Sequence, residues 1–170
     1  MLQAGREGVR QNLESISLLA YAVEVCGSLA REDHPEPRLF GLLETASVIL
    51  DVMNGVPQMA FRLALEAKAL TFAGLCPVLQ HCARCENPLA EKMGWAHSAG
   101  GSVHLDCGPV DCELSLMWLN AIETYRRTPL KDLIDTQPPK GPPFLLADTI
   151  EAHLGRPLRS RSILTSLATV

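Results

Sequence analysis

The hydrophobic positions of the chain follow a helical period in three successive segments. Between residues 12 and 30 the apolar side chains recur three or four positions apart, so they fall on one face of a helix that Asn12 can cap. The period returns over residues 39–53, after a polar stretch broken by two prolines, and again over residues 57–74, where Pro57 suits the first turn. Three amphipathic helices joined by short turns indicate a helical bundle.

The helical period disappears between residues 76 and 112. This segment is rich in Cys, His, Gly and Pro, and Gly100-Gly101 offers a hairpin turn between residues 95–97 and 102–104. It contains too few apolar residues for a core of its own. We therefore expect an irregular insert that another kind of interaction stabilises.

Helices are expected again after the insert. Asp111 can cap a helix over residues 114–125, and a short helix near 130–134 and one over 144–154, closed by Gly155, complete the pattern. The predicted fold is mainly α-helical. A helical bundle formed by residues 1–75 and 113–170 is interrupted by an inserted Cys/His zinc-knuckle hairpin in residues 76–112.

Composition limits the possible functions. With 170 residues, of which 47% are hydrophobic, the chain can build the core of one domain. Its net charge of -4 excludes bulk electrostatic binding of nucleic acid or anionic membranes, so any such binding needs a local patch. No apolar run reaches the roughly 18 residues of a membrane span, and residues 1–10 do not look like a secretion signal. A reducing cytoplasmic location is expected, in which six cysteines do not indicate a disulfide framework.

Two pairs of potential metal ligands give the strongest chemical signal. Cys82-Ala83-Arg84-Cys85 is followed, after 18 residues, by His104-Leu105-Asp106-Cys107. A two-residue gap lets both side chains of a tight knuckle point at one ion, and two knuckles at the ends of a hairpin supply a tetrahedron. The predicted site is a structural zinc ion that replaces the missing core of the insert. Its predicted ligands are Cys82, Cys85, His104 and Cys107.

Alternatives remain open at this stage. Cys112 can take the place of His104, further potential ligands lie nearby at Cys76, His81 and His97, and the site can also hold no metal. A redox dithiol is disfavoured because Cys82 and Cys85 do not stand between a strand and a helix. The sequence shows no phosphate-binding loop, nucleophile elbow or paired catalytic carboxylates, so no enzyme is indicated.

A basic segment near the C-terminus is the second candidate site. Residues 156–161 contain Arg156, Arg159 and Arg161, and no Asp or Glu follows them. Such a patch can bind phosphate or carboxylate groups, or it can be a solvated segment. Leu158 and the apolar residues after Arg161 suggest that the tail packs on the bundle.

Three elements of the chain resemble the RecO family of bacterial recombination mediators. Residues 61–88, FRLALEAKALTFAGLCPVLQHCARCENP, show the family's Leu-rich helix, Gly, Pro-x-Leu and Cys-x-x-Cys in that order. Residues 100–107 are similar to its Gly-Gly-x-x-Cys-x-x-Cys, with His104 in place of the third cysteine. Residues 154–161 resemble its closing Gly-basic-x-Leu-basic-Ser-Arg element.

This resemblance implies a non-enzymatic mediator of DNA repair and recombination, which assists recombinase loading on single-stranded DNA. The implied partners are the single-strand DNA-binding protein and a RecR-type mediator. The acidic tail of the former would bind the arginines beside an apolar wall such as helix 114–125. The family's N-terminal oligonucleotide-binding barrel has no room before the first helix, so we expect this chain alone to bind single-stranded DNA weakly at most. The alternatives are a zinc-stabilised structural or adaptor protein unrelated to DNA metabolism and, third, a thiol oxidoreductase.

Overall fold

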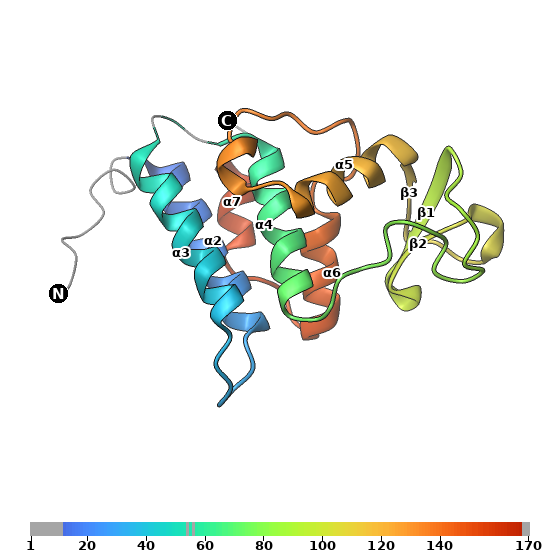
Figure 1. Ribbon diagram of the computed structural model, residues 1–170, viewed down its shortest axis with the longest axis horizontal. Coiled ribbons are helices and arrows are strands. Elements are labelled where there is room, and N and C mark those ends of the chain that lie inside the picture. The colour runs from blue at the N-terminus through green and yellow to red at the C-terminus, as the bar shows by residue number, and fades with distance from the viewer. Residues whose placement is uncertain (1–11, 54, 56, 168–170) are drawn as a thin grey trace.

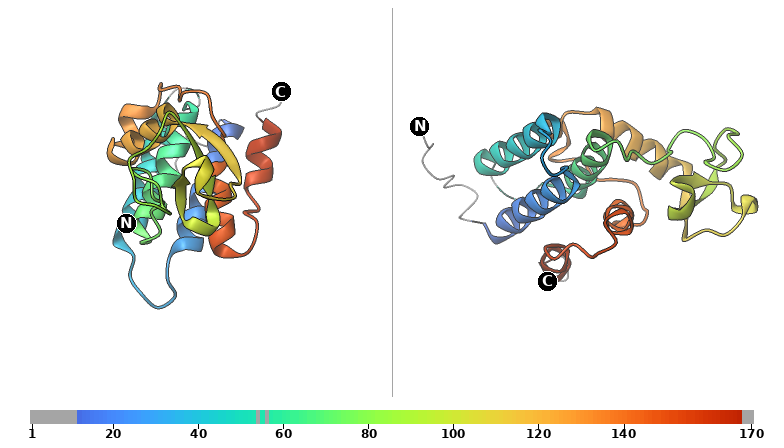
Figure 2. Two further views of the ribbon diagram at one scale, coloured as in Figure 1. Left: turned by 90° about the vertical axis from the view of Figure 1, so that its right-hand side faces the viewer. Right: turned by 90° about the horizontal axis from the view of Figure 1, so that it is seen from below.

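The computed structural model describes residues 12–53, 55 and 57–167 as a helical bundle with a small sheet at one end (Figures 1 and 2). The predicted fold class is therefore confirmed: the protein is mainly α-helical, with a Cys/His hairpin inserted between its helices. The bundle consists of α2 (Leu13–Leu29), α3 (Pro37–Val52), α4 (Met59–Phe72), α5 (Leu116–Arg127), the 3-10 turn η3 (Leu130–Leu133), α6 (Leu145–Leu154) and α7 (Arg161–Leu167).

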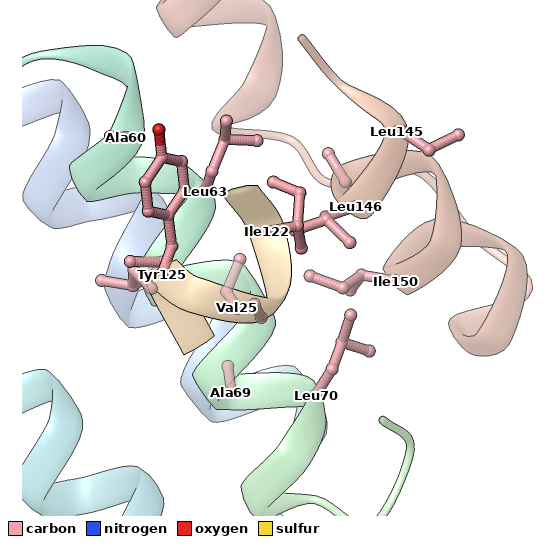
Figure 3. Packing of buried hydrophobic residues seen from close by; sticks show 14 of the residues in the cluster. Val25, Ala60, Leu63, Ala69, Leu70, Ile122, Tyr125, Leu145, Leu146 and Ile150 are labelled. Atoms are coloured by element: carbon pink, nitrogen blue, oxygen red, sulfur yellow. The ribbon is translucent and has the colours of Figure 1, made fainter. Parts of the chain in front are cut away.

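Helix α4 forms the centre of the bundle. It packs against α2, α3, α5 and α6, and in Figure 3 its residues Leu63 and Leu70 face Ile122 of α5 and Ile150 of α6. Ten of its fourteen residues are buried. A helix that is buried around most of its circumference must lie inside a domain, so the other helices are arranged around it.

Of three helix ends predicted from the sequence, two are confirmed and one differs. Asn12 caps α2 as expected, because its side chain accepts hydrogen bonds from the amides of Glu14 and Ser15. Helix α4 begins at Met59, so Pro57 lies before it. Gly155 ends α6 in the predicted left-handed conformation, with φ of +65°. None of the described helices is both long enough and apolar enough to cross a membrane.

The insert contains a three-stranded antiparallel sheet in the order β2-β1-β3. The predicted hairpin is confirmed, since Trp95 pairs with Ser102, Ala96 pairs with Gly101, and Gly100 has φ of +76°. The third strand was not predicted. The elements of the insert are β1 (Lys92–Ala96), η1 (His97–Ala99), β2 (Gly101–Val103), η2 (Leu105–Cys107) and β3 (Cys112–Ser115).

The prediction that Asp111 caps the helix after the insert is wrong. Residues 112–115 form β3, which pairs with β1, and the cap is Ser115, whose side chain accepts a hydrogen bond from the Trp118 amide. The Asp111 carboxylate instead accepts a 2.7 Å hydrogen bond from the His97 amide. The division into residues 1–75 and 113–170 around an insert of residues 76–112 stays a prediction, and its second boundary falls within β3.

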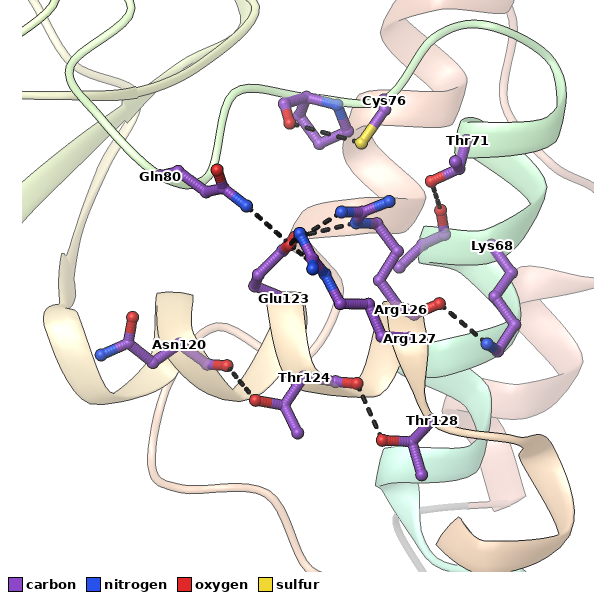
Figure 4. A network of polar contacts seen from close by, with 12 residues as sticks. Lys68, Thr71, Cys76, Gln80, Asn120, Glu123, Thr124, Arg126, Arg127 and Thr128 are labelled. Carbon is purple, nitrogen blue, oxygen red and sulfur yellow. Dashed lines mark hydrogen bonds and ion pairs between the residues drawn. The ribbon is translucent and has the colours of Figure 1, made fainter.

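A polar cluster connects the first segment of the insert to α5 (Figure 4). The carboxylate of Glu123 accepts hydrogen bonds from Gln80, Arg126 and Arg127 at 2.6 to 2.8 Å. The hydrogen bonds from Arg126 are the largest cause that lowers the pKa of Glu123, to about 2. Glu123 is therefore charged at neutral pH and holds the segment around Gln80 against α5.

Candidate metal centre and arginine segment

The four predicted ligands come together at one place. One potential ligand atom each from Cys82, Cys85, His104 and Cys107 lies within 4.8 Å of the other three. The first two residues belong to a tight turn, in which the Glu86 amide donates to the Cys82 carbonyl and the Cys82 amide to the Asn87 carbonyl. His104 is the N-cap of η2, directly after β2, and Cys107 is the last residue of η2. Two short turns at the end of the hairpin thus bring the side chains to a common point.

The tautomer of His104 suits a metal ligand. Its Nε2 lies 2.9 Å from the Pro88 carbonyl oxygen, and a carbonyl can only accept, so Nε2 carries the proton. In the neutral ring Nδ1 is then the free acceptor, and it faces the Sγ atoms of Cys85 and Cys107 at 3.3 and 3.8 Å. A histidine that donates its other ring N–H to a carbonyl is the usual arrangement of a protein metal ligand.

The thiols influence the ionisation of one another. Burial opposes ionisation of Cys82, but the amides of His104, Cys85 and Arg84 point at its sulfur and lower its pKa to about 6. The side-chain hydrogen bond with Cys85, followed by burial and the nearby Cys82 thiol, raises the pKa of Cys107 to about 11. Three thiolates at this separation repel one another, and a bound cation removes that repulsion.

This donor set fits zinc. Three sulfur atoms and one imidazole nitrogen match the Cys₃His combination of structural zinc sites, and four protein ligands complete a tetrahedron. A zinc ion held in this way would cross-link the two turns of a hairpin with little core of its own. Because all four positions are filled by protein, such an ion would have no open position for a substrate.

The other potential ligands lie outside this cluster. Cys112, the alternative fourth ligand, is on β3 opposite Trp95. His97 pairs with Asp111 through Nδ1 at 2.9 Å. Cys76 and His81 are exposed and line a cleft of about 350 Å³ beside α5. The geometry thus brings His104, and not these residues, to the knuckle cysteines.

The arginine segment, residues 156–161, is docked on α2 and α6. Glu24 of α2 accepts hydrogen bonds from the amides of Arg159 and Ser160 at 2.9 and 2.8 Å, and Glu151 of α6 accepts one from the Leu158 amide at 2.9 Å. Leu158 is buried, as the predicted packing of the tail requires. The neighbours are α2 and α6 and not helix 114–125, which we had expected to form the wall beside the arginines.

The three arginines have different surroundings. Arg161 forms ion pairs with Asp148 and Glu151 at 2.6 and 2.5 Å and lies over the ring of Phe144. Arg156 is half exposed, donates to Ser28 at 2.8 Å and lies 3.7 Å from Glu24. Arg159 is exposed, and its side chain lines a cleft of about 430 Å³ together with Arg156, Glu24 and Pro157. Arg156 and Arg159 are therefore the arginines of the segment that face solvent.

Sequence reasoning missed the residues that hold both sites in place. Pro88 contributes through a backbone carbonyl, for which residue types carry no signal. Glu24 and Glu151 were assigned no role, although each lies next to a buried residue of its helix, Val25 in α2 and Ile150 in α6. A search for acidic residues on the buried edge of a helix could have found these two.

The fold and the site define the class of protein: a helical bundle with an inserted Cys/His hairpin. Comparisons with known proteins define the family. The sequence model of the family described as "Recombination protein O C terminal" matches residues 10–162. The chain therefore belongs to the RecO C-terminal family, as the three sequence elements indicate.

Several curated relatives carry the name DNA repair protein RecO. The chain is 35% identical to that of Myxococcus xanthus over 163 residues, covering 92% of this chain and 64% of the relative. It is 30% identical to that of Syntrophotalea carbinolica (95% and 65%) and 32% identical to that of Geobacter metallireducens (94% and 66%). The chain thus spans just under two thirds of the length of these relatives. No solved structure gives a significant match.

Proposed function

We propose that this protein is a mediator of recombinational DNA repair of the RecO type, which acts by binding and not by catalysis. The match of the RecO C-terminal family to residues 10–162 carries this proposal. The names of the relatives favour a role in DNA repair over that of an adaptor unrelated to DNA metabolism. Since the chain spans only part of those relatives, the activity of the whole protein is part of the proposal.

The metal in this proposal is one structural zinc ion held by Cys82, Cys85, His104 and Cys107. The distances among these four side chains and the tautomer of His104 support it. Its role is to fix the shape of the insert, since a site with four protein ligands has no position for a substrate. A metal with a purely structural role is consistent with a protein that acts by binding partners and not by catalysis.

The proposed partners are the single-strand DNA-binding protein and a RecR-type mediator. A peptide tail that is acidic and apolar is best recognised by guanidinium groups beside apolar surface. The cleft between Arg156 and Arg159 provides such groups, whereas Arg161 is paired within the bundle. The exposed arginines of the segment are therefore the proposed contacts for a carboxylate of the partner.

Direct DNA binding by this chain is proposed to be weak. Its net charge is -4 and only 5% of its residues are aromatic, so both phosphate neutralisation and base stacking are limited.

The experiment is a titration of purified single-strand DNA-binding protein, with and without its C-terminal tail, against this chain. Binding is expected only with the tail, and it should weaken as salt rises, because exposed charges are screened within about 10 Å at 0.1 M. Arg159→Ala should weaken binding roughly tenfold, the loss of one charge-assisted hydrogen bond. Arg127→Ala on α5, which removes an arginine 64% exposed, is the matched control.

Equal binding of the tailless protein, or equal binding by the Arg159 and Arg127 variants, would remove the arginine segment from the proposal. Failure to bind both this partner and the RecR-type mediator would overturn the mediator function itself.

A further inference from the structure

Arg84 lies between the first two cysteines of the candidate metal centre and reaches across to the second turn. Its Nη1 donates a hydrogen bond to the Cys107 carbonyl at 3.2 Å, and its Nη2 donates one to the Pro109 carbonyl at 2.9 Å. The side chain is half-buried. One residue of the Cys82–Cys85 turn thus binds the backbone on both sides of Gly108.

The backbone of the second turn leaves room for this guanidinium. Gly108 has φ of +127°, a conformation that residues with a side chain rarely adopt. A Cβ atom at position 108 would lie 2.8 Å from Nη1 of Arg84. Glycine at position 108 therefore suits the conformation of the turn, and a side chain there would oblige the Arg84 guanidinium to shift.

Other links between the two turns bind different parts of the hairpin. The Ala83 amide donates to the Ser102 carbonyl, and the His104 amide donates to the Sγ atom of Cys82. These bonds hold the end of β2 and the first residue of the second turn. The hydrogen bonds of Arg84 hold the far end of that turn, where Cys107 carries its thiol.

The charge of Arg84 also suits the site. Three thiolates and a neutral imidazole around a divalent ion leave a net charge of about -1, which a fixed guanidinium nearby compensates. Arginine suits this task because its planar fork donates to two acceptors at once and stays charged.

We propose that Arg84 is a positioning residue, which joins the two turns and orders Cys107 relative to Cys82, Cys85 and His104 before a metal binds. The inference rests on the proposed zinc site. It assigns a function to one of the two residues inside the Cys-x-x-Cys motif, next to the proposed ligand Cys85.

The test measures zinc affinity by chelator competition in the wild type, Arg84→Ala and Arg84→Lys. Arg84→Ala should bind zinc roughly 10- to 100-fold more weakly, the usual effect of losing an outer-shell partner of a metal site. Arg84→Lys should recover only part of the affinity, because an ammonium keeps the charge but not the two parallel hydrogen bonds. Lys92→Ala, which removes a positive charge from the exposed start of β1, is the control and should match the wild type.

Hydrogen exchange of the metal-free proteins gives a readout that does not depend on zinc. Amides of residues 104–109 should exchange faster in Arg84→Ala than in the wild type, while those of α4 and α5 stay unchanged. Wild-type affinity and wild-type exchange in Arg84→Ala would overturn the inference. If the wild type binds no zinc but the amides of residues 104–109 still exchange faster in Arg84→Ala than in the wild type, the zinc site is overturned and the contact of Arg84 remains supported.

A double-mutant cycle with Gly108→Ala tests the contact itself. The added methyl group displaces the guanidinium and also strains the backbone, so Gly108→Ala should weaken zinc binding in the wild type. In the Arg84→Ala background only the strain remains, and the loss should be smaller. Equal losses in both backgrounds would show that Arg84 and Gly108 act independently and would count against the proposal.

Discussion

The hydroxyl of Tyr21 on α2 donates a 2.7 Å hydrogen bond to Oε1 of Glu66 on α4, at a depth where both residues are fully buried. The same oxygen accepts a bond from Arg62, whose second terminal nitrogen donates to the Pro143 carbonyl. Burial raises the pKa values of Glu66 and Tyr21, whereas the charge of Arg62 opposes the shift in Glu66. The centre of the bundle therefore contains a compact polar network.

Glu66→Ala should destabilise the protein by about 3 to 5 kcal/mol, because it leaves the buried guanidinium of Arg62 without a counter-charge. Tyr21→Phe removes one hydrogen bond and should cost about 1 kcal/mol. Urea unfolding followed by circular dichroism measures both losses. A loss below 1 kcal/mol for Glu66→Ala would show that Arg62 finds another partner or reaches water.

We expect the purified protein to contain one equivalent of zinc. Cys85→Ala, or removal of the metal by a chelator, should increase hydrogen exchange in β1 to β3, while α4 stays protected because its apolar faces pack independently. Elemental analysis and hydrogen exchange measure the two effects. Less than a tenth of an equivalent after gentle purification would contradict the site.

The fourth ligand can be tested separately. His104→Cys should retain zinc, since it converts Cys₃His to Cys₄, and His104→Ala should weaken binding. Unchanged affinity in His104→Ala would instead assign the fourth position to Cys112.

Glu24 should make the docking of the arginine segment dependent on pH. Burial opposes its ionisation, but the hydroxyl and amide of Ser160, followed by the Arg159 amide and the Arg156 charge, outweigh burial and lower its pKa below the ordinary 4.5. A carboxyl whose pKa is lower in the folded state stabilises the fold above its unfolded pKa. This contribution is lost as the pH falls through the folded value.

Unfolding free energies of the wild type and Glu24→Ala should therefore differ at pH 7 and converge below pH 4.5. A difference that stays constant down to pH 3 would mean that packing of the Glu24 side chain, and not its charge, holds the segment.

Glu86 closes the first knuckle in a left-handed conformation, with φ of +61°. This conformation costs a residue with a Cβ roughly 1 to 2 kcal/mol, and glycine avoids the cost. Glu86→Gly should therefore stabilise the insert by about 1 kcal/mol, whereas Glu86→Ala should not. Hydrogen exchange of the amides of residues 82 and 86 measures the effect. Equal exchange rates in Glu86→Gly and Glu86→Ala would contradict the prediction.

The helices and the knuckles could be predicted because their signals are local. A period of three to four residues is enough to place α2, α3 and α6, and a two-residue gap is enough to place Cys82 beside Cys85. The end of the insert could not be predicted in this way. Leu114 and Trp118 are spaced as on a helix, but residues 112–115 pair with β1, some twenty positions earlier.

The surroundings of the arginines also depend on distant parts of the chain. Glu24 lies 135 positions before Arg159, so no local pattern connects the two. The apolar residues beside the arginines indicated that the tail would pack on the bundle, but not that Arg161 would pair with Asp148 and Glu151. Residue types alone therefore predicted a patch of three equivalent charges, whereas the fold distinguishes them.

The last residue of β3, Ser115, is also the cap of α5, and no loop separates the strand from the helix. Hinge motion needs a few residues whose dihedral angles can change, and this junction provides none. The other connection is clamped where Gln80 binds Glu123 of α5. The sheet and α5 should therefore move as one rigid unit, so that a displacement of the turns around Cys85 and Cys107 would also displace Leu119 and Ile122 in the core of the bundle.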